Sequence, residues 1–364
     1  MSNDPFEDLQ AILPSLLGSL EALGFAQRVF GRGNAGQILE AVGAPDEALA
    51  GAGLAMQAWP ENLHGLRARL GVASQAVEHA FENLRGAAAL NDKGGGDDMR
   101  GAFRAFGQLP KAYDALYPLT LGLPPVSRFF LSPAQRGDEE LLTRLAEAPP
   151  QDNTGVFHVG AEPGERGGFS AYVPEYYTPD DAWPLVVALH GGAGNGAGFL
   201  WSWLRDARAY GAILISPTAV GETWALQGPD RDTPNLARIL DIAHANWNID
   251  PQRVLLTGMS DGGTFSYVSG LEPDSPFTHL APCSAAFHPM LAQAADPGRM
   301  QRLPIHITHG AQDWMFDVAM AREAAQSLQA AGANVVYREI DDLAHTYPRE
   351  INPAVLKWLM TTDR

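Results

Sequence analysis

The sequence predicts a mostly parallel α/β sheet flanked by helices, preceded by an all-α domain. Apolar residues recur at three- and four-residue spacing up to about residue 130, which is typical of helices. From residue 155 onward, short apolar runs alternate with helical segments, which indicates a parallel sheet. A stretch rich in proline and charge separates the two patterns. We therefore expect a helical domain over residues 1–130, a linker over 131–153 and an α/β domain over 154–364.

The N-terminal domain is expected to consist of packed helices. Its first helix has one apolar face, formed by Leu9, Ile12, Leu13, Leu16, Leu17, Leu20 and Leu23. Packing against neighbouring helices explains such a face most simply, and contact with lipid or gating of a substrate site are the alternatives. Further helices are expected at residues 36–42, 45–59, 63–90 and 98–116, with a glycine-rich loop at 91–98.

The α/β domain is expected to begin with two short antiparallel strands, at residues 157–159 and 169–173. Six further strands are expected at 185–189, 212–216, 254–257, 280–286, 305–309 and 335–340, with helices between them that include 235–247, 319–331 and 352–360. The carboxyl ends of parallel strands share one edge of a sheet, and functional sites collect at that edge.

The strongest local signal surrounds Ser260. An apolar run at residues 254–257 leads into Gly-Met-Ser-Asp-Gly at 258–262, and a helix-compatible segment follows. Gly-x-Ser-x-Gly between a strand and a helix predicts a sharp turn that exposes the serine hydroxyl. Ser260 is therefore the candidate nucleophile. The backbone N–H of Asp261, at the start of the helix, is a candidate donor to a developing oxyanion.

A serine hydroxyl needs a base to activate it and an acid to orient that base. In this architecture the acid and then the histidine follow the serine along the chain. Asp313 and His345 each come just after a predicted strand, in that order. His345 is the candidate base and Asp313 the candidate acid. The alternatives for the acid are Asp317, Asp341 and Asp342.

Four motifs in sequence order resemble the α/β-hydrolase superfamily. They are His-Gly-Gly at 190–192, Gly-Met-Ser-Asp-Gly at 258–262, His-Gly-Ala-Gln-Asp at 309–313 and Leu-Ala-His at 343–345. The resemblance is greatest to the carboxylesterase/phospholipase branch, which includes feruloyl-esterase-like and polyhydroxybutyrate-depolymerase-like enzymes. It covers about residues 155–362, and the N-terminal part matches nothing in this pattern. It implies that the N–H of Gly192 joins that of Asp261 in an oxyanion hole.

Three tryptophans follow predicted strand ends near the expected site, Trp201, Trp224 and Trp314, and two further aromatic residues, Trp203 and Phe316, lie beside the first and the third. Each is most simply explained by packing, but as a set they favour a substrate with an apolar or aromatic group. Neither a metal nor a cofactor is expected. His306 and His309 lie three residues apart on a strand, which places their side chains on opposite faces.

The predicted function is hydrolysis of carboxylic esters through a Ser-Asp-His triad and an acyl-enzyme intermediate. One alternative is a thioesterase or an amidase or peptidase with the same triad. A second is a non-catalytic hydrolase-fold scaffold whose helical domain binds a partner. A third is lipid or polyester hydrolysis gated by the helical domain, and a homo-oligomer formed through that domain is also open.

Composition limits the partners and the compartment. The chain has 25 Lys and Arg against 42 Asp and Glu, a net charge of −17. This excess of negative charge argues against binding to nucleic acid or to anionic lipid. The acidic N-terminus lacks the pattern of a secretory signal, and no uninterrupted apolar stretch is long enough for stable membrane insertion, so we expect a cytoplasmic protein. The single cysteine, Cys283, excludes an intramolecular disulfide and is expected to be a buried thiol.

Overall fold

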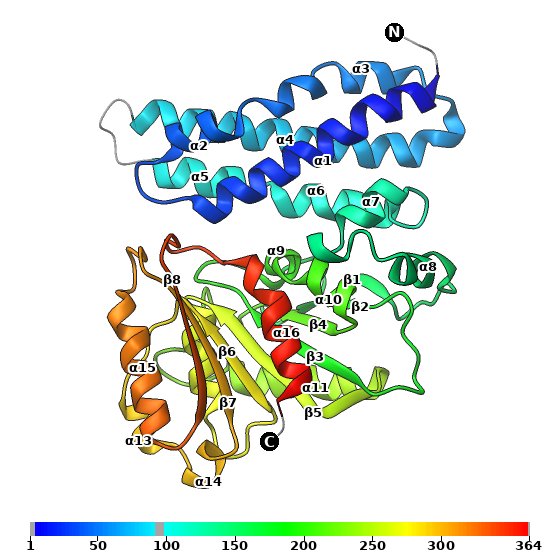
Figure 1. Cartoon of the computed structure of the whole chain (residues 1–364). Coiled ribbons are helices and arrows are strands. Elements are labelled where there is room, and N and C mark those ends of the chain that lie inside the picture. The colour runs from blue at the N-terminus through cyan, green and yellow to red at the C-terminus, as the bar shows by residue number, and fades with distance from the viewer. Residues whose placement is uncertain (1–3, 92–97, 363–364) are drawn as a thin grey trace. The chain divides into compact units, whose positions relative to one another are not determined.

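The computed structural model describes residues 4–91 and 98–362. The chain divides into two compact units, Met1–Phe130 and Leu131–Arg364 (Figure 1). The glycine-rich loop expected at residues 91–98 falls almost entirely outside the described residues.

The N-terminal unit is helical, as the sequence predicts. Its first helix, α1, has an acidic N-cap, Asp4, whose carboxylate accepts from the N–H of Phe6 at 2.9 Å. The predicted apolar face of α1 is buried at Leu16, Leu20 and Leu23. The helices of this unit are α1 (Pro5–Val29), α2 (Ala35–Val42), α3 (Ala52–Gln57), α4 (His64–Asn91), α5 (Asp98–Phe106), α6 (Leu109–Leu116) and α7 (Pro124–Phe129), with short 3-10 turns at Pro45–Leu49, Glu61–Leu63 and Tyr117–Leu119.

Two helices that the periodicity predicts as continuous are broken. The one expected at 45–59 is a 3-10 turn followed by α3, because Gly51 between them adopts a left-handed conformation with φ of 89°. The one expected at 98–116 is divided into α5 and α6. Pro110 lies in the first turn of α6, where backbone N–H groups have no partner within the helix and a missing N–H therefore costs nothing. In the middle of one continuous helix, the same proline would remove a backbone hydrogen bond.

Helix α1 is long and apolar enough to cross a membrane, by length and composition alone. It has 25 residues, and its most apolar 18-residue window has a mean hydropathy of 1.4 and is 39% buried. It is the one such helix among the described residues, and it differs from the expectation that no stretch is long enough. A core helix of a soluble protein passes the same test, so these values alone do not place α1 in a membrane.

The second unit is built on one eight-stranded sheet (Figure 1). Its strand order is β1-β2-β4-β3-β5-β6-β7-β8, with β1, β2 and β4 paired antiparallel and the remaining pairs parallel. The strands are β1 (Gly155–Val159), β2 (Phe169–Val173), β3 (Trp183–Leu189), β4 (Ile213–Pro217), β5 (Ile249–Met259), β6 (His279–Cys283), β7 (Pro304–Gly310) and β8 (Asn334–Ile340). All eight predicted strands are therefore present.

Helices cover both faces of the sheet, which is why the residues of β2, β3, β4, β6 and β7 are buried. Figure 1 shows α16 in front of the sheet and α11 behind it. The helices of this unit are α8 (Glu139–Glu147), α9 (Gly196–Phe199), α10 (Leu204–Tyr210), α11 (Asp232–Asn246), α12 (Asp261–Gly270), α13 (Met290–Ala294), α14 (Pro297–Met300), α15 (Val318–Ala330) and α16 (Asn352–Thr361).

The stretch predicted as a linker, residues 131–153, contains a helix. Leu131, Leu141 and Leu145 are buried together and pack against Tyr176. The guanidinium of Arg144 lies 4.1 Å from the centre of the Tyr176 ring, within range of a cation–π interaction. The first part of this stretch therefore belongs to the same compact unit as the sheet.

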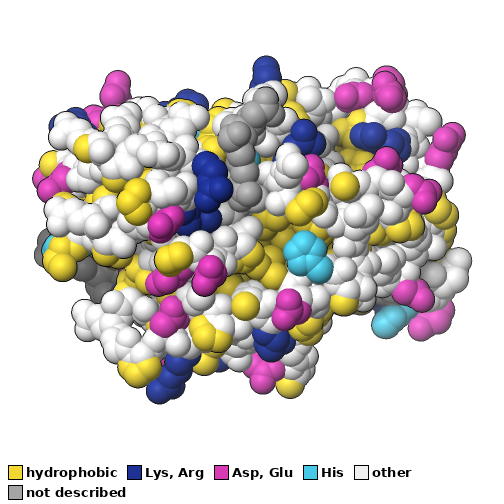
Figure 2. All heavy atoms as spheres, turned by 90° about the horizontal axis from the view of Figure 1, so that it is seen from below, with side chains coloured by type: hydrophobic (Ala, Val, Ile, Leu, Met, Phe, Trp, Pro, Cys, Tyr) yellow, Lys and Arg dark blue, Asp and Glu magenta, His cyan; other side chains and the backbone are white. Residues whose placement is uncertain are grey.

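Charged side chains are dispersed over the face of the molecule that Figure 2 shows. Acidic side chains lie scattered among apolar and uncharged ones, and basic side chains lie between them. On this face the negative charge is spread over the surface and not concentrated in one segment.

Candidate active site

Ser260 stands in a sharp turn between β5, which ends at Met259, and α12, which begins at Asp261. Its φ of 56° and ψ of −121° lie in a region that residues with side chains rarely adopt. Its N–H donates to Cys283 O on β6 at 3.0 Å, which holds the turn against the sheet. A Cβ atom at Gly262 would clash with the carbonyl oxygens of His190 and Leu189, so the motif needs glycine there for close packing.

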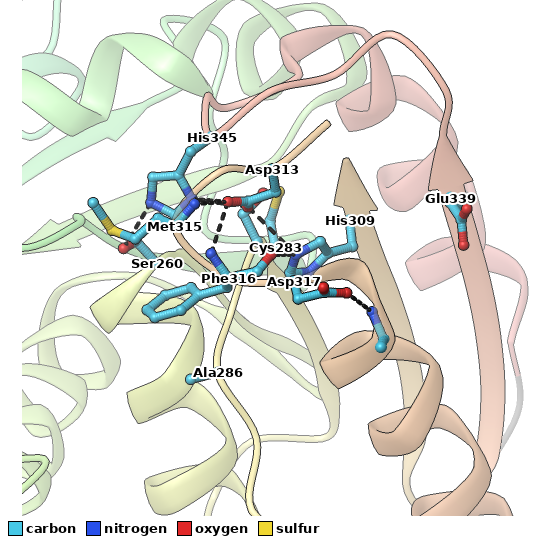
Figure 3. Close-up of polar contacts among 12 residues, drawn as sticks. Ser260, Cys283, Ala286, His309, Asp313, Met315, Phe316, Asp317, Glu339 and His345 are labelled. Carbon is cyan, nitrogen blue, oxygen red and sulfur yellow. Dashed lines mark hydrogen bonds and ion pairs between the residues drawn. The ribbon is translucent and has the colours of Figure 1, made fainter. Parts of the chain in front are cut away.

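The three candidate catalytic side chains form one hydrogen-bonded chain (Figure 3). Ser260 Oγ lies 3.0 Å from His345 Nε2. On the other side of the ring, His345 Nδ1 lies 2.8 Å from Asp313 Oδ2 and 3.0 Å from Oδ1. With Nδ1 donating to the carboxylate, Nε2 is left to accept the serine proton.

The carboxylate of Asp313 is fully buried and is held by several donors. The N–H groups of Met315 and Phe316 each donate to Oδ1 at 2.9 Å, and His309 Nε2 lies 3.3 Å from Oδ2. Burial opposes ionisation, but the hydrogen bonds from His309, His345 and Phe316 outweigh it and hold the pKa of Asp313 well below its ordinary value. Asp313 is therefore a carboxylate beside His345 at neutral pH.

The alternative acids are placed elsewhere. Asp317 caps α15, where its Oδ1 accepts from the N–H of Ala319 at 2.8 Å. Asp341 and Asp342 are exposed in the loop after β8. Among the described residues, Asp313 is the carboxylate bonded to His345.

The His-Gly-Gly turn follows β3 and lies against the elbow. A Cβ atom at Gly191 would be in van der Waals contact with Ser260 Cβ, at 3.5 Å. His190 Nε2 accepts from the N–H of Ala219 at 3.1 Å, while Nδ1 lies 2.6 Å from Gly191 O. Burial lowers the pKa of His190 to about 4, so its ring is neutral and can accept at Nε2. Its contacts are those of a residue that holds the turn.

The two predicted oxyanion donors, Gly192 and Asp261, lie side by side. A Cβ atom at Gly192 would sit 2.8 Å from Asp261 Oδ2. Asp261 is the first residue of α12, so its N–H belongs to the group at a helix start that has no partner within the helix. The structure thus brings the glycine turn and the helix N-terminus together next to Ser260.

The three tryptophans have different surroundings. The ring of half-buried Trp314 lies 5.7 Å from that of His345, centroid to centroid. Trp224 is buried, stacks on Phe265 and donates from Nε1 to His190 O at 2.7 Å. Trp201 is also buried. Of the three, Trp314 has the exposure and position suited to substrate contact, whereas Trp224 is buried and bonded to the His-Gly-Gly turn.

Of the neighbours that follow Asp313, Phe316 was predicted from the sequence to border the site, whereas Met315 was not. Phe316 packs edge-on against His345 at 5.5 Å, and Met315 is exposed beside His345 and Ser260 (Figure 3). The position of Met315 between Trp314 and Phe316, just after Asp313, is the sequence signal that could have indicated it. His309 bonds the backbone of Phe316 at 2.9 Å, as expected of a turn histidine, but its contact with Asp313 was not foreseen.

Metal-ligating groups do not gather here. In the part of the chain that the structure describes, no three His, Cys, Asp or Glu residues are placed to hold a metal ion. His306 packs on Trp358 whereas His309 contacts Asp313. Cys283 is a buried free thiol, as predicted, and burial raises its pKa to about 12.

A family model and two known proteins match parts of the chain. The phospholipase/carboxylesterase family model matches residues 227–362. The chain is 29% identical over 156 residues to a bifunctional acetylxylan esterase/xylanase of Neocallimastix patriciarum, covering 42% of this chain and 22% of that protein. It is 31% identical over 120 residues to a poly(3-hydroxybutyrate) depolymerase of Ralstonia pickettii, covering 27% of this chain and 24% of that one. The chain thus spans about a quarter of each relative.

Solved structures with a similar architecture include a thermostable esterase, with a TM-score of 0.48, 22% identity and coverage of 58% of this chain and 64% of that one. A ferulic acid esterase matches with a TM-score of 0.46 and 15% identity over 57% of this chain and 98% of its own. The sheet order and the family model give the second unit the α/β-hydrolase fold. Within that fold, residues 227–362 resemble the phospholipase/carboxylesterase family.

Proposed function

We propose that the protein cleaves carboxylic esters through Ser260, His345 and Asp313. The observation that carries this proposal is the continuous hydrogen-bonded chain from Ser260 Oγ through His345 to Asp313, with successive distances of 3.0 and 2.8 Å. Ser260 attacks the ester carbonyl carbon while His345 Nε2 takes the hydroxyl proton. Asp313 holds the ring in the tautomer that leaves Nε2 free, and stabilises the imidazolium that forms.

The tetrahedral intermediate carries a negative oxygen, which the backbone N–H groups of Gly192 and Asp261 stabilise. His345 then donates its proton to the departing alcohol, and an acyl group remains on Ser260. A water molecule, activated by the same imidazole, attacks this acyl-enzyme and releases the carboxylic acid. Each proton that His345 accepts is returned in the next step, so the cycle requires neither a metal nor a cofactor.

The surroundings of His345 favour an apolar group on the ester. Trp314, Met315 and Phe316 form a continuous apolar segment beside the imidazole. The relatives named above are an acetylxylan esterase/xylanase and a polyester depolymerase, which supports an ester as the bond that is cleaved. We therefore propose an ester with an apolar acyl or alcohol part that fits against these three side chains.

Labelling with a fluorophosphonate probe tests the nucleophile. We expect one adduct, mapped by mass spectrometry to Ser260, that is abolished in Ser260→Ala and slowed at least about a thousandfold in His345→Ala. Ser15→Ala removes a serine hydroxyl on the exposed side of α1 and serves as the control, with labelling unchanged. Wild-type protein without an adduct, together with no turnover of short-chain aryl esters, would leave the non-catalytic scaffold as the explanation.

A matched series of substrates tests the bond. An ester, a thioester and an amide with the same acyl group share every contact on the acyl side, so their kcat/KM values compare the leaving groups directly. We expect the ester to be cleaved fastest. A thioester cleaved much faster than its ester would assign the protein to the thioesterases, and efficient amide cleavage would assign it to the amidases.

A further inference from the structure

The loop after β4, residues 219–226, reaches both halves of the candidate oxyanion hole with neighbouring side chains. Trp224 Nε1 donates to His190 O at 2.7 Å, on the strand end that leads into the glycine turn. Thr223 Oγ1 donates to Asp261 Oδ2 at 2.6 Å, on the first residue of α12. One short segment therefore holds the turn that presents Gly192 and the helix start that presents the N–H of Asp261.

This loop is itself fixed at both ends. Asp232, which is buried at the start of α11, accepts at Oδ1 from the N–H of Val220 and at Oδ2 from the N–H of Ala225, both at 2.8 Å. Ala219 N–H donates to His190 Nε2 at 3.1 Å. These bonds leave the segment between Val220 and Ala225 little freedom, so Thr223 is presented to Asp261 from a rigid support.

The carboxylate that Thr223 holds lies beside Gly192. Asp261 Oδ2 is 2.8 Å and Thr223 Oγ1 is 3.9 Å from the position that a Cβ atom at Gly192 would occupy. Gly192 is one of the two proposed oxyanion donors, so this carboxylate borders the proposed oxyanion hole. Its orientation matters because a carboxylate and an oxyanion repel each other.

We propose that Thr223 is a positioning residue for the oxyanion hole. Its hydroxyl fixes the Asp261 side chain beside Gly192, and thereby fixes the spacing and direction of the Gly192 and Asp261 N–H groups. This inference rests on the proposed esterase function, and it adds a residue that touches neither the substrate nor the triad. Because the oxyanion exists in the transition state and not in the bound ester, Thr223 affects kcat and leaves KM nearly unchanged.

The test compares three replacements of Thr223 with a matched control. Thr223→Val has nearly the same shape without the hydroxyl, Thr223→Ala removes the hydroxyl with no added methyl group, and Thr223→Ser keeps it. Thr178→Val is the control, because Thr178 Oγ1 also donates to an aspartate, Asp180 Oδ2 at 3.4 Å, in the loop before β3 at the opposite edge of the sheet. Wild type is assayed first, with aryl esters and the phosphonate probe.

We expect Thr223→Val and Thr223→Ala to lower kcat about tenfold or more, since small displacements of catalytic groups cost about this much, with KM within about twofold of wild type. Thr223→Ser restores kcat to within about threefold, and Thr178→Val leaves it unchanged. Binding of an alkyl trifluoromethyl ketone, which forms a tetrahedral oxyanion adduct with the serine, weakens in parallel with kcat. The acidic limb of the pH profile stays in place, because His345 and Asp313 are untouched.

Two results would overturn the inference alone. One is an active wild type whose kcat survives both Thr223→Val and Thr223→Ala. The other is a loss of kcat that Thr223→Ser shares and that follows a lowered Tm, which would show a merely structural role. An inactive wild type would instead overturn the proposed function, and this inference with it.

Discussion

At the scale of single residues, the environment of each ionisable group decides its role. Asp313 and Asp317 are four residues apart, yet one is a buried partner of His345 and the other an exposed helix cap. The difference lies in the turn after β7. There, two backbone N–H groups and two imidazoles converge on Asp313 and stabilise its charge where burial alone would remove it.

We expect Asp313→Asn to lower kcat by about four orders of magnitude with little change in KM, because an amide beside Nδ1 favours the wrong tautomer of His345. Asp317→Asn is the matched control. It weakens the cap of α15 and costs at most about 1 kcal/mol of unfolding free energy, with kcat unchanged. Steady-state kinetics and urea unfolding of both variants check this prediction, which an Asp313→Asn enzyme of near-normal kcat would contradict.

We expect His190 to make the free energy of unfolding depend on pH between about 4 and 6.5. Its folded-state pKa of about 4 lies below its ordinary value of 6.5, so the neutral ring is favoured in the native protein. The contribution of the neutral His190 ring to the free energy of unfolding is complete above pH 6.5. It is lost as the pH falls toward 4, and the difference amounts to about 3 kcal/mol. We expect the advantage of wild type over His190→Gln in unfolding free energy to shrink by about this amount from pH 7 to pH 4. An advantage that is the same at both values would contradict the assignment.

At the scale of elements, the sequence predicted the strands well, because each is a short apolar run bounded by turn residues. The order of motifs places Ser260, Asp313 and His345 each after a strand, and in the structure these three side chains are in hydrogen-bond contact. The sequence missed the break at Gly51, because periodicity carries no sign of a positive φ. Thr223 could not be predicted at all. Its partner lies 38 residues away on another element, and no local pattern marks the pair.

Close contact between elements explains the glycine at position 262. A methyl group there would press α12 away from the end of β3, because it meets the carbonyl oxygens of His190 and Leu189. We expect Gly262→Ala to lower the free energy of unfolding by about 1–3 kcal/mol and to abolish most turnover. In Gly18→Ala, the new methyl group lies on the exposed face of α1 and meets nothing within 4 Å, so the free energy of unfolding of this control should rise by about 0.5–1 kcal/mol. Thermal unfolding of both variants checks the pair.

At the scale of the whole molecule, the boundary of the hydrolase unit falls at residue 131. Leu131, Leu141 and Leu145 are buried against this unit, and each contributes about 1.5–3 kcal/mol on burial. We expect a chain of residues 131–364 to unfold cooperatively. A chain of residues 154–364 should be less stable by about 5 kcal/mol and should expose Tyr176. Urea unfolding followed by fluorescence measures both. Equal urea midpoints for the two chains would show that residues 131–153 act as a linker and do not stabilise the sheet.

The sheet order also has a consequence for how the protein is made. The N-terminal unit is synthesised before the sheet, in which strands distant along the chain pair, as Val187 of β3 does with Leu256 of β5. Such distant parallel pairing is slow to form, because the long intervening chain loses conformational entropy before the strands make stabilising contacts. His345 follows the last strand, so the candidate base of Ser260 is translated after the whole sheet. Under the proposed mechanism, we therefore expect a nascent chain that ends before His345 to lack turnover.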